Sequence, residues 1–208
     1  ENDVHDVISA AKSIERIDYN KIIILGHSMG GLAAPRIAEN NDDVSGLILM
    51  GVNSNKIYDV IERQYDYLLS IQTPTEELED HINYMKEKIQ IIREQEFDKQ
   101  TPASDLVFWN ACFWLDIINY EHVEVAANLK QPIIVLQGER DYQIPMREFY
   151  GWRSGLSSKE NVSFKWYPGL NHLFIHGTGE PNPEEYSKPG NVHEDVIKDI
   201  VNWIDKTY

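Results

Sequence analysis

A serine flanked by glycines occupies a position from which its hydroxyl could react. Residues 26–31 read GHSMGG, after an apolar β-branched run at 21–25 and before a helix-compatible stretch at 32–40. In a G-x-S-x-G turn between strand and helix, the glycines let neighbouring main chain pass and the serine is held in a strained conformation. The Ser28 hydroxyl is therefore predicted to project from the sheet, where helix N–H groups favour an anionic intermediate. The alternative is a turn in which Ser28 only caps the helix.

A serine hydroxyl needs a histidine base and an orienting carboxylate to act as a nucleophile near neutral pH. Asp141 follows an apolar, strand-like run at residues 131–138 that ends in glycine. His172 lies in the loop after the next apolar run, residues 162–167. Open α/β sheets carry their sites where the carboxyl ends of the strands meet loops, so these positions suit an acid and a base.

Other residues compete for these two roles, because the chain contains 7 histidines and 34 carboxylates. Most of them are expected on the surface. His176 is the nearest rival of His172, after an intervening apolar tripeptide. Glu139 comes too early to clear the strand end, and Asp116 belongs to a different segment. Asp141 and His172 are therefore the preferred acid and base.

The pattern resembles the α/β-hydrolase superfamily, and within it the serine esterases and acyl hydrolases with an inserted helical cap. The resemblance rests on residues 26–31, the acid loop 138–145 and the base loop 169–174, and it spans nearly the whole sequence. The run at 136–143 is similar to that of bacterial dienelactone-hydrolase-like proteins. True dienelactone hydrolases use cysteine as the nucleophile, where this sequence has Ser28.

The resemblance implies a triad in the chain order Ser28, Asp141, His172. His172 would take the serine proton, Asp141 would fix the imidazole tautomer, and water would hydrolyse the acyl-enzyme. The backbone N–H of Met29 would hold part of the oxyanion. A carboxylic ester is the expected substrate. A thioesterase, a serine peptidase of the same fold and a catalytically incompetent binding module are the alternatives, and no metal or organic cofactor is implied.

Composition fits one domain and limits the partners. The 208 residues are 42% apolar, and the formal net charge of −15 argues against nucleic acid and anionic membrane surfaces, which attract basic proteins. No apolar run approaches membrane-spanning length. Cys112 is the only cysteine, so an internal disulfide is excluded, and its aromatic neighbours predict an apolar setting in which the thiol is inert.

The alternation of apolar runs and amphipathic stretches predicts an α/β fold with a parallel sheet flanked by helices. The expected strands are 21–25, 44–50, 133–137 and 162–167. The expected helices outside the insertion are 6–17, 32–40 and 192–206.

Residues 53–129 break this alternation and predict a helical cap inserted into a single domain spanning 1–208. They contain two long polar helices, 56–71 and 75–96, with Thr75 as an N-cap. An aromatic cluster at the end of the insertion either anchors the cap or lines an acyl pocket above Ser28. The candidate pocket residues are His27, Trp109, Phe113, Trp114 and Tyr142.

The sequence also predicts that the hydrolase domain is N-terminally incomplete. Only one helix precedes the strand at 21–25, whereas the fold normally places several strands there, one of them followed by the loop that donates the second oxyanion N–H. The strand at 21–25 would then present an unpaired edge, which proteins avoid. We expect another chain, or an N-terminal part of a longer protein, to fill that edge.

Overall fold

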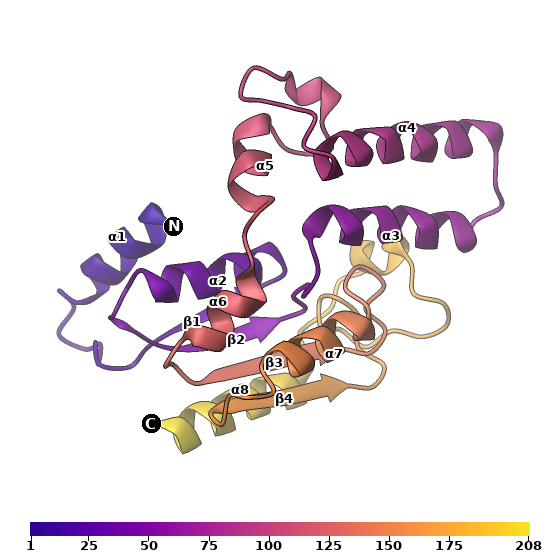
Figure 1. Ribbon diagram of the computed structural model, residues 1–208. Helices are drawn as coiled ribbons and strands as arrows, with labels where there is room; N and C mark the ends of the chain where they lie inside the picture. Colours follow the sequence, from indigo (N-terminus) through magenta and orange to yellow (C-terminus); the bar gives the residue numbers. More distant parts are fainter. The chain divides into compact units, whose positions relative to one another are not determined.

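The computed structural model describes residues 1–208, which divide into two compact units (Figure 1). The first unit combines Glu1–Ser54 with His122–Tyr208, and the second is Asn55–Glu121. The second unit is therefore inserted into the first between two strands. None of the helices combines the length and hydropathy needed to cross a bilayer.

A sheet of four parallel strands forms the centre of the first unit. The strands lie in the order β1 (Ile22–His27), β2 (Val44–Met50), β3 (Ile133–Gly138) and β4 (Val162–Tyr167). The two central strands, β2 and β3, are buried almost throughout. Burial on both faces explains why their sequences are continuous apolar runs rather than alternating ones.

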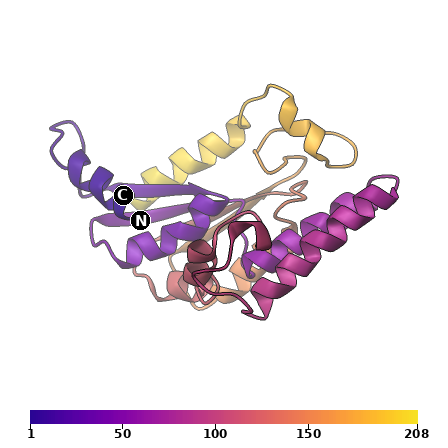
Figure 2. The same cartoon turned by 90° about the horizontal axis from the view of Figure 1, so that it is seen from above.

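Helices cover both faces of this sheet. One face packs on α8 (Glu194–Thr207), whose Val196 and Trp203 join a core that includes Ile48 and Leu136. On the other side of the strands lie α2 (Met29–Glu39), α6 (His122–Asn128) and α7 (Met146–Gly155), as Figure 2 shows. The short helix α1 (Asn2–Ala11) precedes β1, and the short helix η2 (Pro183–Ser187) precedes α8.

The second unit is helical and has its own core. It contains α3 (Ile57–Ser70), α4 (Glu76–Arg93), η1 (Ala103–Asp105) and α5 (Ala111–Ile117). Ile61, Ile89 and Trp114 are buried together in it. Thr75 Oγ1 accepts a hydrogen bond of 3.2 Å from Leu78 N, so the predicted N-cap is confirmed.

The predicted α/β class and parallel sheet are confirmed, and the strands at 44–50 and 162–167 have the predicted bounds. The first helix differs. It spans Asn2–Ala11 instead of residues 6–17, and the chain turns after Ala11, where Ser13 Oγ donates to Ala10 O. β1 runs on to His27, so that Ser28 alone separates it from α2.

The prediction for Cys112 is wrong, because this cysteine is exposed. It lies on α5 between Ala111 and Phe113, where Ala111 and Trp114 are the residues buried in the core of the unit. Positions three apart share one side of a helix, so the residue that follows Ala111 projects away from that side. Cys112 therefore lies outside the buried side of α5 that Ala111 and Trp114 form.

β1 lies at an edge of the sheet, with β2 as its one neighbour. Leu25 of β1 is 51% exposed, whereas its register partner on β2, Ile48, is 2% exposed. An apolar, half-exposed parallel strand at an edge presents unpaired main-chain groups to solvent.

The junction of β1 and α2 is tight enough to require glycine at two positions. A Cβ on Gly26 would lie 2.5 Å from Gly30 O and 2.6 Å from Gly31 Cα. A Cβ on Gly31 would lie 2.1 Å from Val52 Cγ2. These are main-chain or core atoms that cannot retreat, so the strand and the helix approach each other closely only because both residues lack a side chain.

We predict that Gly26→Ala lowers the free energy of unfolding by about 3 kcal/mol or more, because its Cβ overpacks the turn. Gly30→Ala is the matched control, since a Cβ there meets nothing within 4 Å. It lies in the first turn of α2 and should leave stability unchanged or raise it by up to about 1 kcal/mol. Urea unfolding of both variants checks this, and equal effects would contradict the steric explanation.

Candidate active site

Ser28 is held in a strained conformation between β1 and α2. Its φ of 52° and ψ of −119° lie where residues with side chains rarely occur, at a cost of about 1–3 kcal/mol. The Ser28 N–H donates to Met50 O at 2.9 Å, and Ser28 O accepts from Gly31 N at 2.9 Å and Leu32 N at 3.1 Å. Met29 is the first helical residue, so its N–H belongs to the donors that a helix leaves without an internal partner.

The Asp141 carboxylate is buried and bound through both oxygens. Oδ1 accepts from Ile144 N at 2.8 Å. Oδ2 accepts from His172 Nδ1 at 2.6 Å and from Gln137 Nε2 at 3.2 Å. A buried carboxylate is tolerated when donors replace its water shell, and three donors do so here.

His172 is buried beside Asp141 with a defined tautomer. A carboxylate accepts hydrogen bonds, so Nδ1 carries the proton that is shared with Asp141 and Nε2 is left as the basic nitrogen. Gly51, just after β2, has a φ of 57°, and a Cβ on it would lie 3.2 Å from His172 Nδ1. A side chain at Gly51 would therefore crowd the imidazole.

His27 links the serine turn to the histidine loop. Its Nε2 donates to the His172 backbone oxygen at 2.8 Å, and the two imidazole centroids are 4.6 Å apart. Burial lowers the pKa of His27, and the charge of His172 lowers it further. Ser28 adjoins His27 in the chain, although its hydroxyl forms no hydrogen bond with the His172 ring.

The acid and base loops are joined directly by main chain. Glu139 N donates to Tyr167 O at 3.0 Å, and Arg140 N donates to Leu170 O at 2.9 Å. A Cβ on Gly138 would lie 2.6 Å from Leu170 O, so the glycine that ends β3 lets the base loop approach. The two segments that carry Asp141 and His172 are thus fixed to each other before their side chains meet.

The rival residues lie elsewhere. His176 is exposed and forms an isolated bridge with Leu170, and its ring lies against Gly169 rather than against Asp141. Glu139 is exposed, and Asp116 belongs to the second unit.

Gln137 escaped the sequence reasoning although it belongs to this network. Its side chain is buried at the end of β3, and Nε2 donates to Ile144 O at 2.8 Å as well as to Asp141. A polar residue closing an otherwise apolar strand was the signal available in the sequence. No group of three or more His, Cys, Asp or Glu side chains is arranged to hold a metal ion.

The other four pocket candidates form the following contacts within their own units. Tyr142 is half-buried and stacks on Tyr186, with centroids 5.9 Å apart, and burial raises its pKa. Trp109, Phe113 and Trp114 pack together in the second unit, where Trp114 Nε1 donates to Val107 O at 3.0 Å. Their contribution to an acyl pocket stays a prediction.

Comparison with known proteins gives consistent matches. A family model described as serine aminopeptidase, S33, matches residues 2–179. Esterase EstD of Thermotoga maritima is 31% identical over 205 residues, which cover 98% of this chain and 47% of the esterase. The chain thus spans about half the length of this curated relative.

Solved structures agree in fold. Est1E from Butyrivibrio proteoclasticus has a TM-score of 0.57 at 16% identity, with 97% of this chain and 68% of that chain covered. A monoacylglycerol lipase from Paleococcus ferrophilus has a TM-score of 0.52 at 18% identity, with 99% and 76% covered. At such identities the likeness shows the fold.

We predict that His27 makes stability fall on acidification. Its pKa is lower in the folded chain than the usual 6.5, so the unfolded chain binds more protons between those two values. Stability is therefore fully present above about pH 6.5 and is lost as pH falls through the lower, folded pKa. The glutamine of His27→Gln can still donate to His172 O. Urea unfolding of this variant should show a smaller decrease in the free energy of unfolding between about pH 7 and pH 5 than the parent shows. An unchanged pH dependence would contradict this assignment.

Proposed function

Since this chain belongs to the serine aminopeptidase S33 family of α/β-hydrolases, we propose that it is a serine hydrolase that cleaves carboxylic esters. The observation that carries the proposal is the buried pair of His172 and Asp141, because a carboxylate with all its donors in place leaves Nε2 of the imidazole as a base. The strained Ser28 turn and the similarity to an esterase support it.

In the proposed mechanism, Ser28 Oγ attacks the ester carbonyl while His172 Nε2 takes its proton. Asp141 keeps the proton of Nδ1 in place and stabilises the imidazolium that forms. The backbone N–H of Met29 stabilises the oxyanion, aided by the N-terminus of α2. His172 then protonates the leaving alcohol, and the same base activates the water that hydrolyses the acyl-enzyme.

The proposal includes a further strand, supplied by residues outside this sequence, that pairs with β1. The half-exposed β1 edge supports it, as does an adjoining apolar groove of about 530 Å³ lined in part by Leu25, Met50 and Val192. In the fold of this family, the loop after such a strand donates the second oxyanion N–H.

We predict that Ser28→Ala lowers the turnover of a short p-nitrophenyl ester by about 10⁶-fold. A fluorophosphonate probe should label the parent chain at Ser28 and leave the variant unlabelled, whereas a binding module would not be labelled at all. An aminoacyl p-nitroanilide, assayed alongside, distinguishes amide from ester cleavage. Wild-type activity in the variant would exclude Ser28 as the nucleophile.

The base is tested by a matched pair of histidine variants. His172→Ala should reduce turnover as severely as Ser28→Ala, because the triad acts as a unit. His176→Ala, on the same loop but exposed, should retain turnover within a few-fold of the parent. The reverse pattern would assign the base to His176.

We predict that residues 1–208 alone hydrolyse esters about 10²–10³-fold more slowly than a longer chain that supplies the missing donor. Intact mass, light scattering and the ester assay on the same sample decide this. A dimer that Leu25→Lys dissociates would indicate that a second copy fills the β1 edge. A folded monomer with the turnover of the longer chain would show that no further strand is needed.

A further inference from the structure

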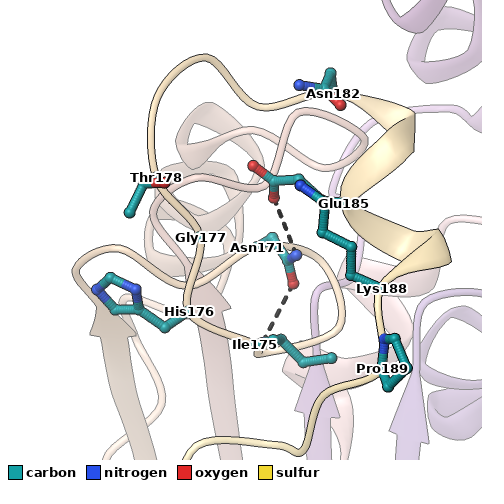
Figure 3. A pocket seen from close by; sticks show the side chains of 9 residues that line it. All are labelled: Asn171, Ile175, His176, Gly177, Thr178, Asn182, Glu185, Lys188 and Pro189. Atoms are coloured by element: carbon teal, nitrogen blue, oxygen red, sulfur yellow. Dashed lines mark hydrogen bonds between the residues drawn. The ribbon is translucent and has the colours of Figure 1, made fainter.

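A surface segment, residues 177–190, folds back on both loops that carry the proposed acid and base. It contains η2 and borders a polar cavity of about 290 Å³ that Asn171 and Glu185 also line. Figure 3 shows the Glu185 side chain directed at Asn171, with Asn171 in turn directed at the main chain of Ile175. We call residues 177–190 the bracing segment.

Glu185 binds the acid loop through Arg140, the residue before Asp141. Arg140 Nη1 donates to Glu185 Oε2 at 3.2 Å, and Arg140 Nη2 forms an ion pair with Oε1. The two side chains are only 14% and 11% exposed, so the pair is less screened than a surface ion pair. Arg140 Nη2 also donates to Thr178 O at 3.2 Å and Gly179 O at 3.0 Å, which ties the start of the bracing segment to the acid loop.

The same carboxylate binds the base loop through Asn171, the residue before His172. Asn171 Nδ2 donates to Glu185 Oε2 at 3.1 Å. Asn171 Oδ1 accepts from Leu173 N at 3.0 Å and Ile175 N at 3.2 Å, so the amide sets the main-chain path on the far side of His172. Glu185 therefore fixes the orientation of an amide that shapes the histidine loop.

A second contact of η2 lies on the other side of Asp141. Tyr186 stacks on Tyr142, the residue after Asp141, with an interplanar angle of 19°. The bracing segment thus contacts the neighbours of Asp141 on both sides.

We propose that Glu185 is a positioning residue, which holds the acid and base loops so that His172 and Asp141 stay in hydrogen-bonding register. This inference rests on the proposed hydrolase function. Burial alone would raise the pKa of Glu185, but hydrogen bonds from Arg140 and Asn171 outweigh it and lower the pKa, so the carboxylate remains charged at neutral pH.

Glu185→Ala tests the role, with Glu184→Ala as the matched control from the adjacent, exposed position. We expect Glu185→Ala to lower kcat by about 10–10²-fold with KM nearly unchanged, because small displacements of reacting groups have effects of that size. The kcat of Glu185→Gln should lie between those of Glu185→Ala and the parent, since an amide oxygen still accepts from Asn171 but the ion pair with Arg140 is lost. Glu184→Ala should match the parent.

A second readout does not depend on activity. The proton on His172 Nδ1 gives a downfield NMR signal while it is held by Asp141, and His172→Ala assigns that signal. We expect it to broaden or disappear in Glu185→Ala and to persist in Glu184→Ala. If the parent neither hydrolyses esters nor labels at Ser28, the proposed function fails, and the NMR comparison still decides the positioning role.

Gly177→Ala perturbs the same contacts without touching Glu185. Its Cβ would lie 1.8 Å from Arg140 Nη1 and 2.8 Å from Glu185 Oε2, which are the ends of flexible side chains and can move without disturbing the core. A folded Gly177→Ala chain should lose kcat and the downfield signal as Glu185→Ala does. Parent-like kcat and signal in either folded variant would overturn the proposal.

Discussion

The close approach of β1 to α2 is the constraint on which the site depends. Gly26 and Gly31 let the strand and the helix meet with main-chain atoms in contact, and only that approach forces the single intervening residue, Ser28, to a φ of 52°. A strained residue persists when its surroundings over-determine it. Here they do so from three directions, through the strand, the helix and the hydrogen bond to Met50. The surrounding contacts therefore keep Ser28 in its strained conformation.

The positions of the proposed acid and base, Asp141 and His172, depend instead on the need to satisfy buried polar groups. Asp141 is surrounded by donors from a strand, a turn and the imidazole, namely Gln137, Ile144 and His172. Losing the Ile144 N–H bond would leave Oδ1 unpaired, at a cost of about 1–3 kcal/mol, whereas losing either Gln137 or His172 would leave Oδ2 with a single donor. The hydrogen bond that helps to satisfy the buried carboxylate therefore also orients the imidazole.

The sequence predicted those features that local patterns determine. The strand at 44–50 is recognisable because burial on both faces requires a continuous apolar run. The serine turn is recognisable because the close approach of strand and helix requires glycines at fixed positions. The first helix ends earlier than its apolar periodicity predicts, because periodicity alone does not mark the residue at which a helix stops. Cys112 was misjudged because neighbours in sequence lie on different sides of a helix.

The polar contacts around the loops escaped prediction for another reason. Glu185 lies 45 residues from Arg140 and 14 from Asn171, and nothing in the local sequence of any of them indicates a shared partner. Such contacts join loops that are distant in sequence and that only the complete fold brings together. Gln137 was not predicted either, although a polar residue at the end of an apolar strand is at least visible in the sequence.

The insertion leaves and re-enters the first unit at nearly one point. Asn53 O and His122 Nε2, at the two crossings, are 2.7 Å apart. The N–H and the hydroxyl of Ser54 both donate to Glu148 Oε2, at 2.8 and 3.0 Å. For the sheet, the whole helical unit is therefore equivalent to one long loop, and loop length changes closure entropy only slowly. The length of that unit can therefore change at little cost to the closure of the sheet, because Asn53 and His122 hold its two ends together whatever lies between them.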